Sequence, residues 1–489
     1  MKQTLPVITG LLFFVLTSAF ASAPAKAAAD KTADRQDPPS PEGFGAASRP
    51  NIILIFADDL GYGDLGCYGS KLRTPVIDRL ASEGLRSTDC LVAANVCGPS
   101  RAALMTGRYP MRCGHPISRH DSPKYAKYGM APDELTIAEL LKTAGYYNKM
   151  VGKWHLGFSV DGSHPLAAGF DEYLGLHSNY SKTKADADTL YRNREVQEAE
   201  IAFEKVTKLY TDEVVDFIKE ERKEPFFIYF AHHIAHSPIL PSTAFKGTSG
   251  IRGRAGAYGD FILELDHSVG RVLAAVEEAG IGDNTLVVFL SDNGPAINGS
   301  AKPLSGGKYA TMEGGHRIPG IFHWPGHIPA GQVSDAMITS MDLLPLFCHV
   351  AGVELPADRK IDGKNIIDLL TGEARQSPHE YFYYYNGLNL QAVRNEKWKL
   401  HLPRTIADQP YWAKKAGGNR MKIHLSLDKP MLFDLDNDVR EKKNVISQHP
   451  EVAAVLMKEA ERIRAEIGDV HIIGSDQRPH NLVNPNEKD

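Results

Sequence analysis

NIILIFADD, residues Asn51–Asp59, opens with an unbroken apolar run and ends in two acidic residues. Such a run is typical of a strand that is buried on both faces, as in a parallel sheet covered by helices. Thr285–Ser291 repeats the arrangement and leads directly into Asp292. Because α/β sheets place their sites at the carboxyl ends of parallel strands, these runs predict a polar site at one edge of the sheet.

A third apolar run, Phe226–Ala231, leads into His232, His233 and His236. Helical patterns alternate with the apolar runs: Thr136–Ala144 ends at a glycine, and Tyr258–Ala279 carries apolar residues along one face. Alternating strands and helices predict a layered α/β domain with a mostly parallel central sheet.

The acidic residues at the strand ends predict a metal site. Asp58, Asp59, Asp292 and Asn293 together offer only hard oxygen ligands, without sulfur or imidazole, and this set suits calcium or magnesium better than zinc. Calcium is the first choice, because its larger and less regular shell accepts an amide oxygen and a substrate oxygen together, and magnesium stays open as the alternative. Taken singly, either acidic pair is more typical of a turn.

Cys97-Gly98-Pro99-Ser100-Arg101 predicts a nucleophile site at the start of a helix. Pro99 fits the first turn of a helix through Ser100–Met105 that Gly107 would end. Cys97 then lies where free backbone N–H groups favour an anion, and Arg101 lies one turn further on. For this pentapeptide alone, a buried or disulfide-bonded structural cysteine is an equally good interpretation.

Two lysines are candidates for binding an anionic substrate. Lys153-Trp154-His155 follows the short segment Met150-Val151-Gly152, and Lys308 follows Gly306-Gly307, where missing side chains let an anion approach the backbone. A substrate group that carries negative charge on its oxygens needs cations of this kind in its site. Each lysine alone has a simpler interpretation as a solvated side chain.

The motifs, taken in order, resemble those of the formylglycine-dependent type I sulfatases, and most closely those of the arylsulfatase A and N-acetylgalactosamine-6-sulfatase branch. The residues that carry the resemblance are Ala57–Asp64, Cys97–Arg101 with Thr106-Gly107-Arg108, Gly152–Gly157, Ser291–Gly294 and Gly306–Lys308. The similarity runs from about Asn51 through the tail. It implies an alkaline-phosphatase-like layered domain and a smaller C-terminal α+β subdomain with an antiparallel sheet.

The resemblance also implies a mechanism. Cys97 would be converted by a formylglycine-generating maturase, a transient partner, to the aldehyde 3-oxoalanine, which hydrates to a geminal diol. One hydroxyl would attack sulfur and the other would then expel sulfate. By the resemblance, Asp292 accepts the nucleophile's proton, His155 bonds the spare hydroxyl and Arg101 holds the hydrate. The implied metal ligands are Asp58, Asp59, position 97, Asp292 and Asn293.

The same resemblance assigns the substrate contacts. His236 would protonate the leaving group, although the segment departs slightly from the family pattern and His232 and His233 are rivals. Lys153 and Lys308 would bind the sulfate oxygens with the metal, and Ser178 is a further candidate for such a contact. The predicted substrate is a sulfated carbohydrate, with aryl sulfates also accepted. Loops Ser118–Met130 and His177–Glu200 are expected to set specificity.

Composition and the chain ends bound the remaining possibilities. The chain has 489 residues, 43% of them hydrophobic, and a net charge of −5, which gives no reason to expect nucleic-acid binding. Residues 1–29 predict a signal peptide, and 30–48 predict a disordered linker. We therefore expect a protein exported to a bacterial periplasm or secreted, without a stable membrane anchor. Five cysteines leave one unpaired or chemically used, and the other four could be bridged or free; they are Cys67, Cys90, Cys113 and Cys348.

The predicted catalytic domain spans 49–375 and the C-terminal subdomain 376–489. Aromatic and charged residues alternate after about Arg375, and this pattern predicts antiparallel strands followed by a helix. The predicted strands are Tyr381–Tyr385, Leu390–Arg394, Lys397–Leu402 and Met431–Leu435, and the helix is Pro450–Ile463. Asn386–Asn389 and His401–Arg404 are expected to face the alcohol part of the substrate.

Two other functions remain in view. A phosphate or phosphonate ester hydrolase uses similar clusters of metal and cations. A non-catalytic receptor for sulfated glycans would keep the fold but leave Cys97 unmodified. The C-x-P-x-R pattern argues against the first, and the complete set of cations argues against the second.

Overall fold

The computed structural model describes residues 49–118, 129–158, 162–181, 187–410, 412–413 and 425–479. The predicted signal peptide and linker lie outside the described residues, as does most of the predicted specificity loop Ser118–Met130. No helix in the described part of the chain is both long and apolar enough to cross a membrane. All five cysteines lie in the described part and are free thiols.

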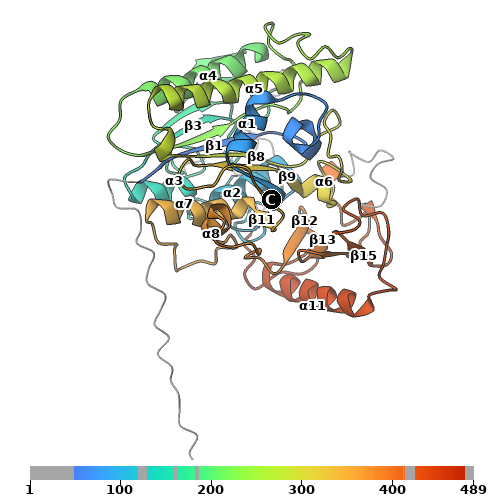
Figure 1. Ribbon diagram of the computed structural model, residues 1–489. Coiled ribbons are helices and arrows are strands. Elements are labelled where there is room, and N and C mark those ends of the chain that lie inside the picture. Colours follow the sequence, from blue (N-terminus) through green and yellow to red (C-terminus); the bar gives the residue numbers. More distant parts are fainter. Residues whose placement is uncertain are drawn as a thin grey trace, which may run out of the picture. The chain divides into compact units, whose positions relative to one another are not determined.

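The large sheet is mostly parallel, as predicted (Figure 1). In order across the sheet, the described strands are β10 (Gln332–Ser334), β2 (Leu85–Leu91), β9 (Arg317–His323), β8 (Thr285–Ser291), β1 (Asn51–Ala57), β7 (Phe226–Ala231), β3 (Tyr147–Gly152), β4 (Glu172–Gly175), β5 (Leu190–Arg192) and β6 (Glu195–Glu198), with β11 (Ile338–Thr339) beside β2. The central strands β8, β1, β7, β3 and β4 run parallel, whereas β9, β5 and β6 pair antiparallel with their neighbours.

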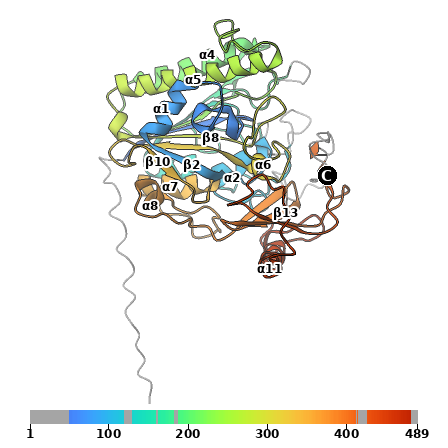
Figure 2. The same ribbon diagram turned by 45° about the vertical axis from the view of Figure 1, so that its right-hand side comes forward.

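Helices cover both faces of this sheet, which is why its central strands are apolar throughout (Figures 1 and 2). The alternation along β1 shows the two layers: Ile52, Leu54 and Phe56 belong to one hydrophobic core, and Ile53 and Ile55 to the other. The helices of the first core are α2 (Cys97–Thr106), α3 (Ile137–Thr143), α7 (Leu343–Ala351) and α8 (Ile367–Thr371), and those of the second are α1 (Pro75–Glu83), α4 (Phe203–Lys219) and α5 (Arg254–Glu278).

The predicted elements of this domain are confirmed, with small changes at helix ends. The strands β1, β7 and β8 have the predicted bounds. Helix α5 begins at Arg254, one turn before the predicted start, and α3 is capped by Thr136, whose hydroxyl accepts from the N–H of Glu139. Helix α2 begins at Cys97 itself rather than after it, and ends at Gly107 in the left-handed conformation (φ 65°).

The C-terminal part forms a second, antiparallel sheet, as predicted. Its strand order is β12 (Phe382–Asn386), β13 (Asn389–Arg394), β14 (Trp398–His401) and β15 (Met431–Asp434), and α11 (Pro450–Ile467) packs on β13 and β14. Its hydrophobic core also includes Leu91, Ala93 and Ala103 of the larger domain. Since Ala103 belongs to α2, this sheet supports the helix that carries Cys97. Short helical segments complete the fold: η1 (Tyr62–Asp64), η2 (Gly66–Tyr68), η4 (Gly282–Asn284), α6 (Glu313–His316) and η5 (Ser340–Asp342).

Candidate active site

The carboxyl ends of β1 and β8 bring the predicted acidic residues together. Ala57 and Ser291 are paired in the register of these strands, so Asp58 and Asp292 leave the sheet side by side. The N–H of Asp59 donates to Oδ1 of Asp292 at 3.0 Å, and the side-chain amide of Asn293 donates to Oδ1 of Asp59 at 2.8 Å. All four side chains are buried. The strand-end pattern of the sequence therefore describes a real cluster.

This cluster has the chemistry of a site for a hard cation. One oxygen from each of Asp58, Asp59 and Asp292 and the sulfur of Cys97 lie within 4.8 Å of one another. The buried Oδ1 of Asn293 has no hydrogen-bond partner among the described residues. Asp59 has a left-handed backbone (φ 60°), an uncommon conformation for a residue with a side chain that is frequent at functional sites. Converging carboxylates with an unpaired amide oxygen fit calcium or magnesium.

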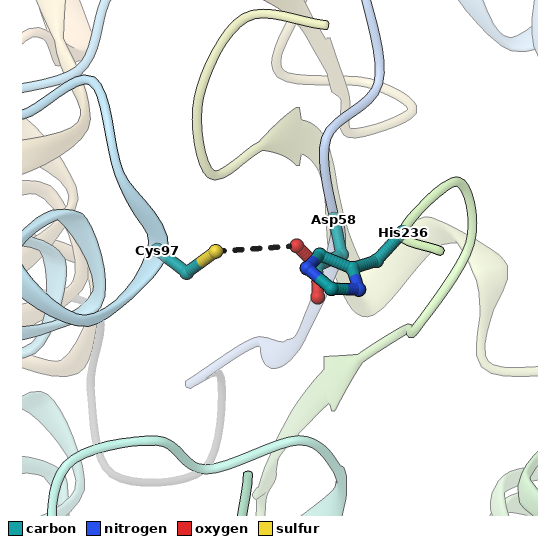
Figure 3. Close-up of side chains that lie close together, drawn as sticks. All are labelled: Asp58, Cys97 and His236. Atoms are coloured by element: carbon teal, nitrogen blue, oxygen red, sulfur yellow. Dashed lines mark hydrogen bonds between the residues drawn. The ribbon is translucent and has the colours of Figure 1, made fainter. Parts of the chain in front are cut away.

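Cys97 is the first residue of α2, and it points from the helix towards the acidic cluster (Figure 3). Its Sγ lies 3.6 Å from Oδ1 of Asp58, and the amine of Lys308 donates to it at 3.2 Å. Burial raises the pKa of the thiol to about 12, although Lys153 and Lys308 act in the opposite direction. Cys97 thus lies between the metal-type cluster and a lysine that the sequence assigned to sulfate binding.

Three buried cations surround the carboxylates. Lys153 Nζ lies 2.6 Å from Oδ2 of Asp58, and Lys308 Nζ lies 2.6 Å from Oδ1 of Asp59. Arg101 donates to Oδ2 of Asp292 through Nη2 at 2.9 Å and through Nε at 3.2 Å. We call Asp58, Asp59, Asp292, Cys97, Lys153, Lys308 and Arg101 together the Asp58 cluster. Its two Lys–Asp contacts and the Arg101 contact are charge-assisted, and they hold the carboxylates in place.

The cations do not act equally on the carboxylates. Burial alone would raise the pKa of Asp58, but Lys153, His236 and Arg101 hold it well below its ordinary value. Burial and the charge of Asp58 raise the pKa of Asp292 to about 7. Two carboxylates in one site thus have pKa values moved in opposite directions, a pattern that is frequent at functional sites.

His236 is the histidine whose side chain lies next to Asp58 and Cys97 (Figure 3), and His233 lines the same small pocket as Asp58 and His236. The Nε2 of His236 lies 3.8 Å from Oδ2 of Asp59, its Nδ1 lies 2.6 Å from the carbonyl oxygen of Ser237, and its side chain is 19% exposed. His232 accepts from the N–H of Ile234 through Nδ1, and His233 lies 3.3 Å from the hydroxyl of Thr207. Both rivals are buried, and His232 contacts its own loop while His233 contacts α4.

His155 and Ser178 are buried close to the site. His155 has a left-handed backbone (φ 63°), and its N–H donates to the carbonyl of His177 at 2.8 Å. Ser178 lines a small pocket with Lys153 and His236, and its hydroxyl has no hydrogen-bond partner in the part of the chain that the structure describes. Ser178 thus lies beside Lys153, which we expect to bind sulfate oxygens, and beside His236, which we expect to protonate the leaving group.

The structure adds residues near the site that the sequence did not indicate. Tyr229 of β7 receives a hydrogen bond from Nη1 of Arg101 at 3.3 Å, and Tyr309 follows Lys308 directly.

Two residues that we expected to face the substrate, Arg404 and Asn389, make other contacts. Arg404 donates to the carbonyls of Gln391 and Leu402. The side-chain amide of Asn389 donates to Oδ1 of Asp469 at 3.5 Å. No motif or periodicity in the sequence could have indicated these contacts, because they depend on the tertiary fold.

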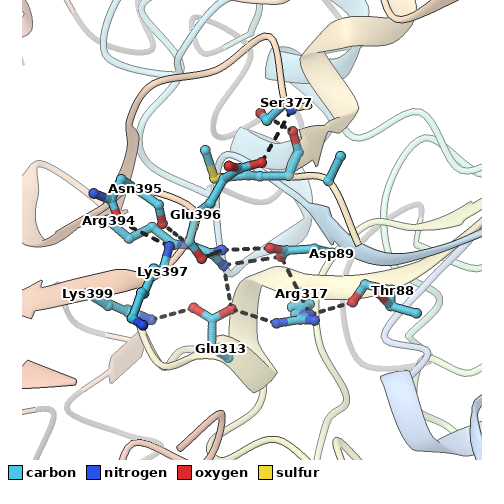
Figure 4. Close-up of polar contacts among 12 residues, drawn as sticks. Thr88, Asp89, Glu313, Arg317, Ser377, Arg394, Asn395, Glu396, Lys397 and Lys399 are labelled. Carbon is cyan, nitrogen blue, oxygen red and sulfur yellow. Dashed lines mark hydrogen bonds and ion pairs between the residues drawn. The ribbon is translucent and has the colours of Figure 1, made fainter. Parts of the chain in front are cut away.

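A second buried charge cluster lies where the larger domain meets the C-terminal sheet (Figure 4). Arg394 of β13 contacts Oδ2 of Asp89 at 2.6 Å and Oε2 of Glu313 at 2.8 Å, and Lys399 of β14 contacts Oε1 of Glu313 at 2.9 Å. We call this set the Glu313 cluster; its members are Asp89, Glu313, Arg317, Arg394, Lys399 and Glu441. Burial would raise the pKa of Glu313, but Lys399, Arg394 and Arg317 hold it below its ordinary value.

Known proteins resemble the chain along most of its length. A family model described as Sulfatase matches residues 50–353, and one described as the C-terminal region of aryl-sulfatase matches residues 377–484. The chain is 38% identical over 427 residues to an arylsulfatase of Hemicentrotus pulcherrimus, covering 80% of this chain and 76% of that protein. It is 40% identical over 384 residues to human N-acetylgalactosamine-6-sulfatase, covering 73% and 72%. Human steryl-sulfatase is 32% identical over 518 residues, covering 85% and 88%.

Solved structures agree with these matches. The structure of Ps i-CgsB in complex with k-i-k-neocarrahexaose has a TM-score of 0.76 at 30% identity and covers 89% of this chain and 94% of its own. The PsFucS1 sulfatase from Pseudoalteromonas sp. has a TM-score of 0.72 at 28% identity, covering 85% and 90%. With the sheet order described above, this likeness confirms the alkaline-phosphatase-like layered fold that the sequence motifs implied.

Proposed function

The chain belongs to the sulfatase family and is a sulfuric ester hydrolase, and from that premise we propose that it releases sulfate from a sulfated saccharide with residue 97 as the nucleophile. The observation that carries the proposal is the position of Cys97. Its sulfur lies between Asp58, at 3.6 Å, and Lys308, at 3.2 Å. A nucleophile there would lie between the proposed cation site at Asp58 and the amine of Lys308, both of which could contact sulfate oxygens.

A calcium ion is the metal that we propose for the Asp58 cluster, with magnesium as the alternative. Asp58, Asp59, Asp292, Asn293 and position 97 would hold it, and the unpaired oxygen of Asn293 supports this assignment. When bound, such a cation supplies positive charge against the sulfate oxygens and the developing charge of the reaction.

We further propose that Cys97 is converted to formylglycine, whose hydrate supplies two hydroxyls on one carbon, one for attack on sulfur and one for the release of sulfate. Arg101 would orient this residue, because its guanidinium is fixed by Asp292 and by the carbonyl of Lys153 at 2.9 Å. Asp292 would accept the attacking hydroxyl's proton. His155 would bond the second hydroxyl.

The remaining polar groups would bind the sulfate and assist departure of the alcohol. Lys153 and Lys308 each have an amine beside one aspartate of the site, and both would turn their remaining donors to sulfate oxygens. Ser178, which lines a small pocket with Lys153, would donate a further hydrogen bond to a sulfate oxygen. His236 is partly exposed at the mouth of the site, where it would give a proton to the oxygen of the leaving alcohol.

A carbohydrate is the alcohol that we propose, with aryl sulfates as further substrates. The relatives support this choice: one is named for N-acetylgalactosamine 6-sulfate hydrolysis, one structural neighbour holds a neocarrahexaose, and another relative is an arylsulfatase. We also propose export through residues 1–29, a linker at 30–48, a catalytic domain over 49–375, a C-terminal subdomain over 376–489, and transient contact with a formylglycine-generating maturase.

A peptide mass spectrum across Cys97 in protein from its own host tests this proposal. The expected result is an aldehyde in place of the thiol, together with sulfate release from 4-nitrophenyl sulfate and from sulfated monosaccharides. An unmodified thiol without sulfate release would favour a glycan receptor. Faster turnover of 4-nitrophenyl phosphate than of 4-nitrophenyl sulfate would favour a phosphate ester hydrolase.

A further inference from the structure

Tyr309 lies beside the site with its ring next to the lysine that reaches Cys97. The amine of Lys308 lies 5.6 Å from the centre of the Tyr309 ring, and the same amine donates to the sulfur of Cys97 at 3.2 Å. Tyr309 is half-buried. A substrate whose sulfate contacts Lys308 would therefore place its alcohol part within reach of this ring.

The backbone of Tyr309 is held firmly in an unusual conformation. Its φ of 73° is left-handed, which is a genuine outlier for a bulky residue. Its N–H donates to the carbonyl of Asn95 at 3.1 Å, and its own carbonyl accepts from the side-chain amide of Asn386 at 3.2 Å. Strained residues persist where the surroundings over-determine them, and they cluster at active sites and ligand clamps.

Residues of the C-terminal part of the chain contact Tyr309 and help to hold it in place. The indole N–H of Trp412 donates to Oδ1 of Asn386 at 3.1 Å, so one amide fixes both aromatic residues. Trp412 and Val96 are buried together, and Tyr309 packs against them. Val96 precedes Cys97, so this apolar cluster joins the nucleophile, the tyrosine and the C-terminal part. Asn386 thus acts on the site through Tyr309, although we expected it to face the substrate directly.

We propose that Tyr309 is a specificity-determining residue, whose partly exposed side chain contacts the sugar ring that carries the sulfate. This inference rests on the proposed function. A pyranose has an apolar face of C–H groups and a polar rim, and a tyrosine offers a flat apolar face with a polar tip at low entropic cost. Lys153 and Lys308 bind the sulfate half, so Tyr309 adds affinity for the alcohol half alone.

The test compares Tyr309→Ala and Tyr309→Phe with the wild-type protein, using N-acetylgalactosamine 6-sulfate, galactose 6-sulfate and 4-nitrophenyl sulfate. For Tyr309→Ala we expect KM for the better sugar sulfate to rise about tenfold while kcat stays within about threefold, and Tyr309→Phe to keep the wild-type KM. Inorganic sulfate, added as a competitive inhibitor, should keep its Ki within about twofold, because the sulfate half is bound elsewhere. Tyr381→Ala, which removes a half-buried tyrosine of the C-terminal part, is the matched control.

An unchanged KM in Tyr309→Ala would overturn the proposal. A parallel rise in the Ki of inorganic sulfate would also overturn it, because Tyr309 would then act by positioning Lys308. If Tyr309→Ala does not fold, Tyr309→Leu keeps the bulk without the aromatic face, and a wild-type KM in that variant would be equally decisive. Failure of the proposed function has a different signature, since the wild-type protein would then release no sulfate from any of the three esters.

Discussion

The Asp58 cluster and the Glu313 cluster have the same formal composition and opposite designs. Each contains three carboxylates and three cations, and nearly all of these side chains are buried. In the Glu313 cluster the charges alternate, because Arg394 lies between Asp89 and Glu313, and Lys399 between Glu313 and Glu441. Each carboxylate of the Glu313 cluster therefore contacts a cation of the same cluster.

In the Asp58 cluster the carboxylates converge instead. Asp58, Asp59 and Asp292 direct oxygens to one place, the cations approach from outside, and the oxygen of Asn293 stays unpaired among the described residues. This comparison teaches that the inventory of buried charges does not identify an active site. Convergence of like charges and unpaired polar atoms do, because they cost stability unless a ligand uses them.

The largest difference between the clusters should appear on removal of the nucleophile. We expect Cys97→Ala to reduce kcat/KM for 4-nitrophenyl sulfate by at least about 10⁴-fold, since a covalent mechanism loses its reacting atom. Stability should be unaffected, because the thiol makes only a long contact, 3.6 Å, with Asp58 and one with Lys308. Initial rates and urea denaturation measure the two effects. Residual activity above one tenth of the wild type would mean that another group attacks sulfur.

The Glu313 cluster should respond in the reverse sense. Glu313→Gln leaves the three cations of the cluster with only two carboxylates, Asp89 and Glu441, so we expect the free energy of unfolding to fall by about 3–5 kcal/mol. Urea denaturation monitored by tryptophan fluorescence measures this change, with the exposed Glu354→Gln as the matched control. The Michaelis constant of the molecules that remain folded should stay that of the wild type. A stable variant with an altered Michaelis constant would contradict the division of roles between the clusters.

Lys308 allows the same comparison within a single residue type. Lys308→Ala should lower kcat/KM by about 100–1000-fold, equivalent to about 2.7–4 kcal/mol, because it removes one stabiliser of the transition-state charge. Lys399→Met in the Glu313 cluster is the control, since it removes a buried lysine that lies beside two glutamates and far along the chain from Cys97. Steady-state kinetics on both variants decide the point. If Lys399→Met lowered kcat/KM of the folded protein as much as Lys308→Ala, burial alone would explain the loss.

The sequence predicted the parts of this molecule in which local pattern and tertiary position agree. Strands β1, β7 and β8 are continuous apolar runs because helices cover both faces, and their bounds were predicted without error. Strand β2 was missed, because Leu85–Leu91 contains four consecutive polar residues, of which Asp89 is paired only through the fold. Strand β9 was also missed, since it contains a proline and a glycine.

The same reasoning explains which site residues could be predicted. Asp58 and Asp292 each follow an apolar strand directly, and the carboxyl ends of parallel strands meet at one edge of a sheet, so the pattern predicts that the two carboxylates lie near each other. The partners of Arg394 lie 305 and 81 residues away along the chain, and no local signal connects them. Tyr309 was passed over because its significance comes from Asn386, on a strand of the other sheet.

Cation binding gives the smallest effect and the sharpest comparison, because only the Asp58 cluster has oxygens that converge. Calcium at a hundredfold excess over its Kd should raise the free energy of unfolding by about 2.7 kcal/mol, with magnesium giving less at equal concentration. Asn293→Ala removes the unpaired oxygen and should reduce this gain, whereas Glu441→Gln in the Glu313 cluster should lower basal stability but leave the gain intact. Thermal unfolding of chelator-treated protein, with and without added calcium, measures both. Loss of the calcium response in Glu441→Gln but not in Asn293→Ala would place the cation site in the Glu313 cluster. Converging carboxylates would then not be the feature that distinguishes a cation site from a cluster of alternating charges.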